Sequence, residues 1–580
     1  EICSRDWSSD VCSSDLKAEN AGCHGVSIIG DLAVINGALR FAEIHGGSSS
    51  SHNHGLWIGS NATVAAPEIE ALEVMGGKGK AHDYGIYVEQ GTLGSFLTRR
   101  ISLSAGSLGT GSFEVGLRID PKGVVQVGDN GAIVLIGHGG GTLSNVDSRC
   151  NYGVWLCSPL LSSGSNPVQI TGIGGLGSNK GDSCHHGVAI EESLLIDSVA
   201  FCDCIGGMGA NRNYGVYLGA NTVARNQLIF SNIAGGGGAD STDNHGLAIT
   251  GGCTIDAPSI LGEGIVSGAG SGHNYGLYIG GSTLGSANTK LLSISARSLG
   301  TCSHEMGIRL DDDCTDLNGV IQIGDGGVLT LVGQGGGLED SCGSHNHGIS
   351  ISHSMGRTSP HGGLLELGRQ EGGATACLTG LGGSGLKGSH IGVSIEGAVH
   401  ASGSTPNALQ LMNCKGGSQG NDNYGVYLSP GTCGTSGESA IDLGTGIFEC
   451  RHISGGGDAS SSGNHGVVFS FHNVHPLNAS HILLQEIFSG AGTGMSLPGN
   501  CGWITLGNRP VTIGSKSTQR IEISAQSVGK GSGEIGVATS LSGCDTMFQV
   551  GPQGAIVLQG TGGGLDSTAG ERNSGIYLSR

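Results

Sequence analysis

Apolar and variable positions alternate in short stretches along the whole chain, and each stretch follows a glycine. The clearest stretches read Asn-Tyr-Gly or Asn-His-Gly and then apolar, variable, apolar, as in Asn213 to Leu218, NYGVYL. A period of two is typical of a strand with one buried face. We therefore expect Val216 and Leu218 to face a core and Tyr217 to face solvent. The same phase predicts burial of Leu247, Ile249, Leu277 and Ile279, and exposure of Ala248 and Tyr278.

This motif recurs through almost the whole chain. Eight close copies contribute a structural corner motif: Asn53, Gly55, Asn151, Gly153, Asn213, Gly215, Asn244, Gly246, Asn274, Gly276, Asn346, Gly348, Asn423, Gly425, Asn464 and Gly466. Nine looser copies centre on Gly25, Gly85, Gly116, Gly187, Gly307, Gly392, Gly494, Gly536 and Gly575. Seventeen motif glycines span 575 − 25 = 550 residues, and 550/16 is about 34 residues per repeat. Such a period is a signature of repeat architectures.

A second apolar stretch follows each motif and ends in a glycine-rich bend, as in Val168–Gly172 and Leu329–Gly333. Neither stretch can bury its apolar face alone, whereas stacked repeats form a continuous interior. We expect the motif asparagine at a corner, bonding the next repeat in a ladder, and the motif glycine in a tight turn. The fold class predicted is all-β, a parallel β-helix (β-solenoid) of about seventeen imperfect repeats. A β-propeller is disfavoured because units of 28 to 44 residues show two short strands rather than four.

A longer period groups the repeats in cassettes of six. Tyr84-Gly85-Ile86-Tyr87 returns as Tyr275-Gly276-Leu277-Tyr278, and we place cassette seams near residues 84, 275 and 493. Residues 21–580 are predicted to form a single continuous solenoid. Residues 1–20 are interpreted as a non-native or disordered lead, because residues 1–16 lack the repeat and resemble the translation of a sequencing adapter.

The alternation of I-x-I-x-G-x-G-G strands with Asn-Tyr-Gly-Val-x-Leu strands over residues 21–580 resembles the repetitive β-helical surface proteins of bacteria. Filamentous-haemagglutinin-like and autotransporter-type adhesins are the most similar class. The resemblance implies an exported protein, extracellular or on the cell surface, and carries over no binding residue. Sixteen cysteines outside the lead are many for an autotransporter passenger domain.

Composition narrows the range of partners. The chain holds 114 glycines and carries a formal net charge of −20, without a basic cluster. Nucleic acid is therefore not expected as a partner, since nothing neutralises its phosphates. No run of about eighteen apolar residues is present, so no transmembrane segment is expected. The cysteines could be disulfide staples or small buried apolar residues, and the sequence leaves both open.

Candidate chemistry is sparse. The best carboxylate cluster is Asp311, Asp312, Asp313 and Asp316, beside His304 and Arg309, and it could in principle act on a glycan. We interpret it as an insertion loop of one cassette. Tyrosine replaces histidine freely at the motif corners, which a zinc ligand would not tolerate. No metal and no cofactor are expected.

The sequence therefore predicts a structural and adhesive surface rod of a bacterium and not an enzyme. Its partners would be host glycans or surface proteins, bound weakly and multivalently through loops on one face, such as 352–363 and 430–439. A glycan-active β-helix enzyme (a lyase or hydrolase) and a passive matrix or shell protein are the alternatives.

Overall fold

The computed structural model describes residues 22–578, apart from residues 49, 145–147, 164–165, 178–183, 210, 313–316, 353–361, 369–371, 402–405, 430–440, 471–476, 493–498, 507–510, 540–545 and 565–572. The chain divides into two compact units, unit 1 (Glu1–Leu247) and unit 2 (Ala248–Arg580). The predicted single solenoid of residues 21–580 and its seams stay predictions. The predicted lead, residues 1–20, lies outside the described residues.

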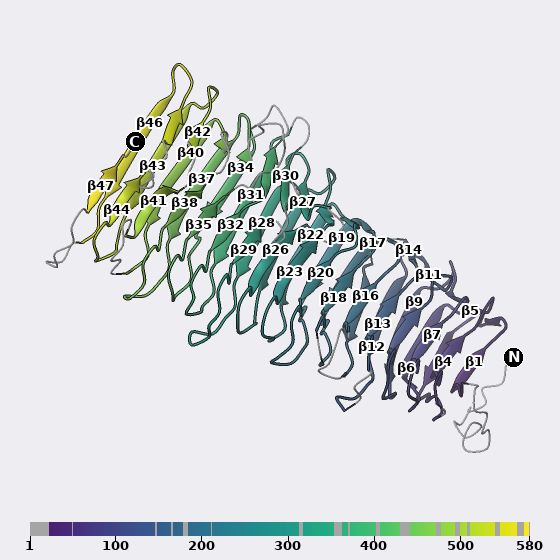
Figure 1. Ribbon diagram of the computed structural model, residues 1–580. Helices are drawn as coiled ribbons and strands as arrows, with labels where there is room; N and C mark the ends of the chain where they lie inside the picture. Colours follow the sequence, from purple (N-terminus) through teal and green to yellow (C-terminus); the bar gives the residue numbers. More distant parts are fainter. Residues whose placement is uncertain are drawn as a thin grey trace. The chain divides into compact units, whose positions relative to one another are not determined.

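Each unit is a parallel β-solenoid, which confirms the predicted fold class (Figure 1). The strands that follow the motif glycines pair in parallel with their counterparts one repeat later, without a shift. In unit 1 these motif strands are β1 (Val26–Ile28), β4 (Leu56–Ile58), β7 (Ile86–Val88), β10 (Leu117–Ile119), β13 (Val154–Leu156), β16 (Val188–Ile190) and β18 (Val216–Leu218). Each repeat is thus one coil.

Unit 2 repeats this arrangement. Its motif strands are β23 (Tyr275–Gly280), β26 (Met306–Asp311), β29 (Ile349–Ile351), β32 (Val393–Ile395), β35 (Val426–Leu428), β38 (Val467–Ser470), β41 (Cys501–Leu506), β44 (Ile535–Ala538) and β47 (Ser574–Tyr577). Strand β20 (Leu247–Ile249) lies at the boundary between the units. The described residues contain no α-helix, and therefore no helix that is long and apolar enough to cross a membrane.

One motif copy was misplaced from the sequence. Gly494 lies outside the described residues, and the strand of that coil, β41, starts at Cys501. Trp503 pairs with Val537, which directly follows the motif glycine Gly536. Gly502 therefore holds the motif position of this coil.

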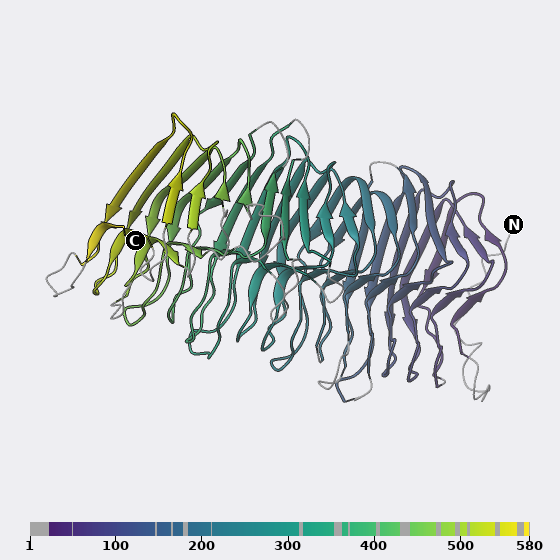
Figure 2. The ribbon, with the colours of Figure 1, turned by 45° about the horizontal axis from the view of Figure 1, so that its top comes forward.

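Most coils contain three strands rather than the two that the sequence predicted. The second predicted stretch forms a long strand, such as β12 (Ala132–His138), β15 (Val168–Ile173), β17 (Leu194–Cys202), β28 (Val328–Gln334) and β31 (Thr375–Leu381). A short strand lies between the motif strand and the long strand, such as β5 (Thr63–Ala65), β8 (Thr92–Gly94), β24 (Thr283–Gly285) and β27 (Val320–Ile323). Loops extend from successive coils on one side of each unit (Figure 2).

The predicted core positions are buried. Val216, Leu218, Leu247, Ile249, Leu277 and Ile279 have no exposed surface. The outward position is less open than expected: Tyr217 is half-buried, and Ala248 is fully buried. Ala189 shows the reason in unit 1, because it pairs with Trp155 on one side and Tyr217 on the other. Large side chains on neighbouring coils cover a small one between them.

Two glycine columns meet where the long strand approaches the motif strand. A Cβ on Gly172 would lie 2.1 Å from the carbonyl oxygen of Gly187, and one on Gly333 would lie 2.2 Å from that of Gly348. No side chain fits in this gap. The approach of two backbones therefore explains the glycine that ends the I-x-I-x-G pattern.

Candidate functional site

The motif asparagines form buried polar ladders. In unit 1, the Oδ1 of Asn213 accepts a hydrogen bond from the backbone N–H of His185, one coil earlier, at 3.1 Å. The backbone N–H of Asn213 donates in turn to Oδ1 of Asn244, one coil later, at 3.1 Å. The same links join His390, Asn423 and Asn464 in unit 2. Asn53, Asn151, Asn213, Asn244, Asn274, Asn346, Asn423 and Asn464 all have no exposed surface.

The ladder requires an acceptor rather than an asparagine. The backbone N–H of Asn53 donates to Oδ1 of Asp83 at 2.7 Å, and that of Asn151 reaches Nδ1 of His185 at 3.3 Å. Glu114 holds the same position and accepts from the backbone N–H of Asp83 at 3.2 Å. Each side chain satisfies a buried backbone group of the coil before it. This explains why most of the looser copies of the motif carry Asp, Glu or His.

Replacing Asn213 by alanine is expected to lower the free energy of unfolding by about 1–3 kcal/mol, because it leaves the backbone N–H of His185 buried without an acceptor. Chemical denaturation measures the effect. Asn213→His is the matched control, since His185 already serves as acceptor in the same ladder. Equal stability of Asn213→Ala and the wild type would show that the ladder contributes nothing.

The motif glycines do not form the tight turn that the sequence predicted. None of Gly55, Gly153, Gly215, Gly246, Gly276, Gly348, Gly425 and Gly466 has a positive φ. A Cβ on Gly215 would lie 2.8 Å from the carbonyl oxygen of Gly246, and one on Gly425 the same distance from that of Gly466. These glycines are required because neighbouring coils approach them closely.

The left-handed residue of the corner lies three positions before the motif glycine. It has φ 61° at His52, 59° at His82, 55° at His273 and 58° at His345. Few residues other than glycine adopt this conformation, although histidine, asparagine and aspartate do so more readily than most. This corner was not recognised in the sequence, where its signal is a histidine that often precedes the motif asparagine.

Aromatic rings stack along the outer side of these corners. In unit 1 the ring of His54 lies 4.8 Å from those of His24 and Tyr84, nearly parallel to both. A second stack joins Tyr152 and His186 at 4.9 Å. Stacked rings at the coil repeat favour the in-register arrangement of the coils.

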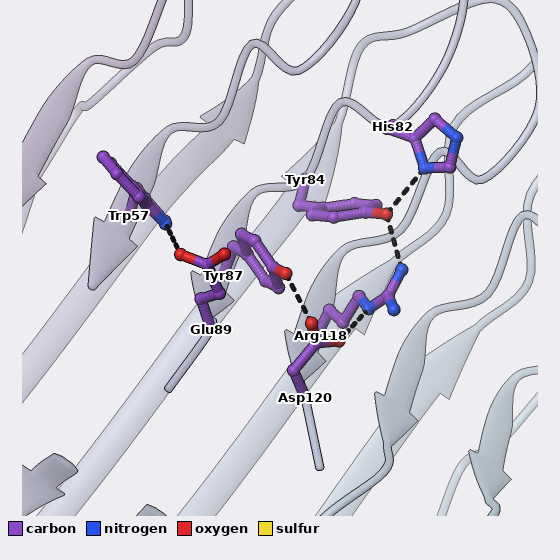
Figure 3. Close-up of polar contacts among 7 residues, drawn as sticks. All are labelled: Trp57, His82, Tyr84, Tyr87, Glu89, Arg118 and Asp120. Atoms are coloured by element: carbon purple, nitrogen blue, oxygen red, sulfur yellow. Dashed lines mark hydrogen bonds and ion pairs between the residues drawn. The ribbon is translucent and has the colours of Figure 1, made fainter. Parts of the chain in front are cut away.

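Arg118 lies at the centre of an outward cluster in unit 1 (Figure 3). Its Nε contacts Oδ1 of Asp120 at 2.6 Å, and its Nη1 donates to the Tyr84 hydroxyl at 2.6 Å. The Tyr87 hydroxyl donates to Oδ2 of Asp120 at 2.5 Å. The guanidinium carbon lies 4.0 Å from the centre of the Trp155 ring, a cation–π distance. Burial raises the pKa of Tyr84 to about 12, so its hydroxyl stays protonated.

Two further contacts extend this cluster. The Nδ1 of His82 lies 2.9 Å from the Tyr84 hydroxyl, and the indole N–H of Trp57 donates to Oε2 of Glu89 at 3.3 Å (Figure 3). The middle residues of four successive motif strands hold equivalent outward positions and are each half-buried. They are Trp57, Tyr87, Arg118 and Trp155. We call these four residues the aromatic row.

Unit 2 contains a second copy of the central cluster. Arg309 binds Asp311, with Nη2 2.5 Å from Oδ2, and its guanidinium carbon lies 5.5 Å from the centre of the Tyr275 ring. The Nδ1 of His273 lies 3.1 Å from the Tyr275 hydroxyl, and the equivalent contact in unit 1, between Nδ1 of His82 and the Tyr84 hydroxyl, is 2.9 Å. This copy is buried, because the side chain of Arg309 is 7 % exposed, whereas that of Arg118 is 18 % exposed. The third cassette has Ile504 and Ala538 at the positions of Tyr87 and Arg118.

The predicted carboxylate cluster is not a loop as a whole. Asp311 ends strand β26, pairs with Arg309 and corresponds to Asp120 of unit 1. Asp311 and Asp312 are 6 % and 2 % exposed, so neither is open to a glycan. Burial raises the pKa of Asp311 to about 6, against the lowering effect of Arg309. Asp313 and Asp316 lie outside the described residues, and His304 stacks on His273 and His345 at 4.7 and 5.1 Å.

Buried acids occupy the ladder in both units. Burial raises the pKa of Glu114 and of Glu305 to about 8 in each case. The Oε1 of Glu305 accepts a hydrogen bond from the side-chain amide of Asn274 at 3.1 Å, and its Oε2 contacts the Ser298 hydroxyl at 3.0 Å. Over the part of the chain that the structure describes, no three His, Cys, Asp or Glu side chains group as metal ligands.

The sequence placed the ladder but missed the Arg118 cluster. The sequence feature that could have revealed this cluster is the cassette period, which aligns Tyr84 with Tyr275 and Arg118 with Arg309. Comparison of the chain with protein-family models, curated proteins and solved structures found no significant match.

Proposed function

We propose that the protein is a structural and adhesive β-solenoid of a bacterial cell surface, exported from the cell, which binds glycans weakly through the aromatic row of unit 1. The observation that carries the proposal is the row itself: Trp57, Tyr87 and Trp155 are partly exposed rings on a rigid sheet face. Neighbouring motif strands are about 4.8 Å apart, and Arg118 lies on the strand between those of Tyr87 and Trp155, so the four side chains form a narrow track across successive coils.

The chemistry of the row suits a sugar chain. An aromatic ring can stack on the apolar face of a pyranose, while carboxylates accept hydrogen bonds from its hydroxyl groups. Glu89 and Asp120 lie beside the rings, each half-buried. The ion pair with Asp120 and the ring of Trp155 hold Arg118 in place. Fixed groups lose little conformational entropy on binding.

The proposed contacts are individually weak. A face of stacked coils suits repeated binding along an extended ligand, where several contacts act together. The loops first expected to bind, 352–363 and 430–439, fall almost entirely outside the described residues, and their role stays a prediction. The buried Asp311 and Asp312 offer less support to an enzyme than the aromatic row offers to a binding face.

Replacing Trp57 and Trp155 together by alanine is expected to weaken glycan binding by about 5- to 150-fold, since each lost ring contact contributes about 0.5–1.5 kcal/mol. An array of neutral and amino-sugar oligosaccharides identifies a ligand, and titration of the best one measures the loss. Tyr427→Ala is the matched control, because Tyr427 holds the same outward position in unit 2 between Ser394 and Val468. Wild-type affinity in the double variant would contradict the proposal. A wild-type protein that binds no glycan would favour the passive shell.

A further inference from the structure

Cys150 and Cys184 hold the same corner position on neighbouring coils of unit 1. Each lies three residues before a motif glycine, Gly153 and Gly187. The strands that follow pair in register, with Val154 opposite Val188. The pairing extends back to the corner, because the backbone N–H of Asn151 bonds Nδ1 of His185 and the rings of Tyr152 and His186 stack at 4.9 Å.

This register places the two cysteines one coil apart, with a Cα separation of about 4.8 Å. Disulfides form at Cα separations of about 4.4–6.8 Å. Cys150 has φ 53°, the left-handed conformation of His52 and His82 at the same position. The rings of His52 and His82 stack at 5.1 Å with only 12° between their planes, so these two left-handed residues on neighbouring coils project their side chains in parallel.

Both cysteines contact one apolar cluster, formed by Tyr84, Val115, Tyr152 and Ala189. Both are half-buried, which leaves them within reach of a small reagent. Their column has no other cysteine among the corners described in unit 1, which carry His52, His82, Phe113, Arg212 and Asp243. The structure joins Cys150 to no other cysteine.

We propose that Cys150 and Cys184 form a disulfide staple between neighbouring coils when the protein meets a small-molecule disulfide. The Cys150 or Cys184 thiolate attacks the reagent, and the mixed disulfide is then displaced by the second thiolate. The two protein thiols lose two protons and two electrons in total. The reagent takes them up and leaves as two thiols, so the exchange is balanced.

The bond would close a loop of 184 − 150 = 34 residues. Loop closure restricts the unfolded chain, so the staple stabilises the coils that it joins. Burial raises the pKa of the Cys150 thiol, so only a small fraction of it is thiolate near neutral pH and the exchange is slow there. The reaction is therefore expected to accelerate as the pH rises toward 9.

The test treats the full chain with oxidised glutathione, without denaturant, and maps its disulfides by mass spectrometry. Trypsin cuts after Arg149, Lys180 and Arg212, so the staple joins peptide 150–180 to peptide 181–212. The expected product is that joined pair, separated again by a reducing agent. The midpoint of thermal unfolding should rise by a few degrees with it.

Three variants identify the residues, because peptide 150–180 also contains Cys157, and peptide 181–212 also contains Cys202 and Cys204. Cys150→Ser and Cys184→Ser must each abolish the join, whereas Cys157→Ser must keep it. The exposed Cys342 serves as a control for the reagent and should carry glutathione. Glutathione adducts on Cys150 and Cys184 in place of the joined pair, or a join that survives Cys150→Ser, would overturn the proposal.

Discussion

Replacing Gly187 by alanine is expected to lower the free energy of unfolding of unit 1 by about 3 kcal/mol or more. The added Cβ would lie 2.5 Å from the carbonyl oxygen of Gly215, 2.6 Å from that of Gly172 and 2.8 Å from that of Ile205. All three atoms belong to backbones held by interstrand hydrogen bonds, so none can move aside without disturbing its own coil. Tryptophan fluorescence during denaturation reports the loss.

Gly238→Ala is the matched control, since a Cβ there would meet nothing within 4 Å and its φ is not positive. It should be neutral or slightly stabilising, because alanine restricts the unfolded chain more than glycine. Equal stability of the two variants would mean that the motif glycines are not needed for close approach.

The second large effect is a loss of stability on going from acid to mildly alkaline pH. Burial raises the pKa of Glu305 from 4.5 to about 8 in the folded chain, so the folded state holds a proton that the unfolded state releases. Below pH 4.5 both states are protonated and the contribution is fully present. Between pH 4.5 and 8 it falls by about 1.4 kcal/mol per pH unit, on the order of 5 kcal/mol in all. Above pH 8 it is lost.

Glu305→Gln tests this because a neutral amide imitates the protonated acid. The stability of the variant relative to the wild type, measured by denaturation from pH 5 to 9, should rise steadily and level off above pH 8. Buried histidines act in the opposite direction, since burial lowers the pKa of His185 to about 4 and of His465 to about 3. Their contribution is lost as the pH falls below 6.5, and it cancels when Glu305→Gln is compared with the wild type at the same pH. A pH-independent difference would contradict the prediction.

Much of the fold could be predicted because alternation and spacing are local properties of the chain. Val216 and Leu218 follow a glycine at a fixed distance, and their burial follows from the period of two. The short third strand was missed because segments such as Thr92–Gly94 are too short to show a period. The buried Ala248 was missed because its exposure depends on neighbouring coils and not on its own strand.

The site was predicted less completely for a related reason. The asparagine ladder repeats with the motif and can therefore be recognised in the amino-acid sequence. The equivalence of Asn, Asp, Glu and His in the ladder is visible only when Asn53 is seen to bond Asp83 and Asn151 to bond His185. Likewise, Tyr87 and Arg118 come from different repeats, and only the stacking of coils joins them through Asp120.

The polar ladder also has a consequence for how such a chain can grow. At this position, each coil needs one acceptor from the coil after it, for a single backbone N–H. Asn213 supplies this acceptor to His185, and Asn423 supplies it to His390. A coil that supplies this acceptor and keeps the glycines that allow neighbouring coils to approach can follow any other, whatever its outward side chains are. Gene duplication can therefore copy a block of coils and insert it without redesigning the junction. The outward positions are then free to diverge, from Tyr87 and Tyr278 to Ile504, while the scaffold beneath them stays interchangeable.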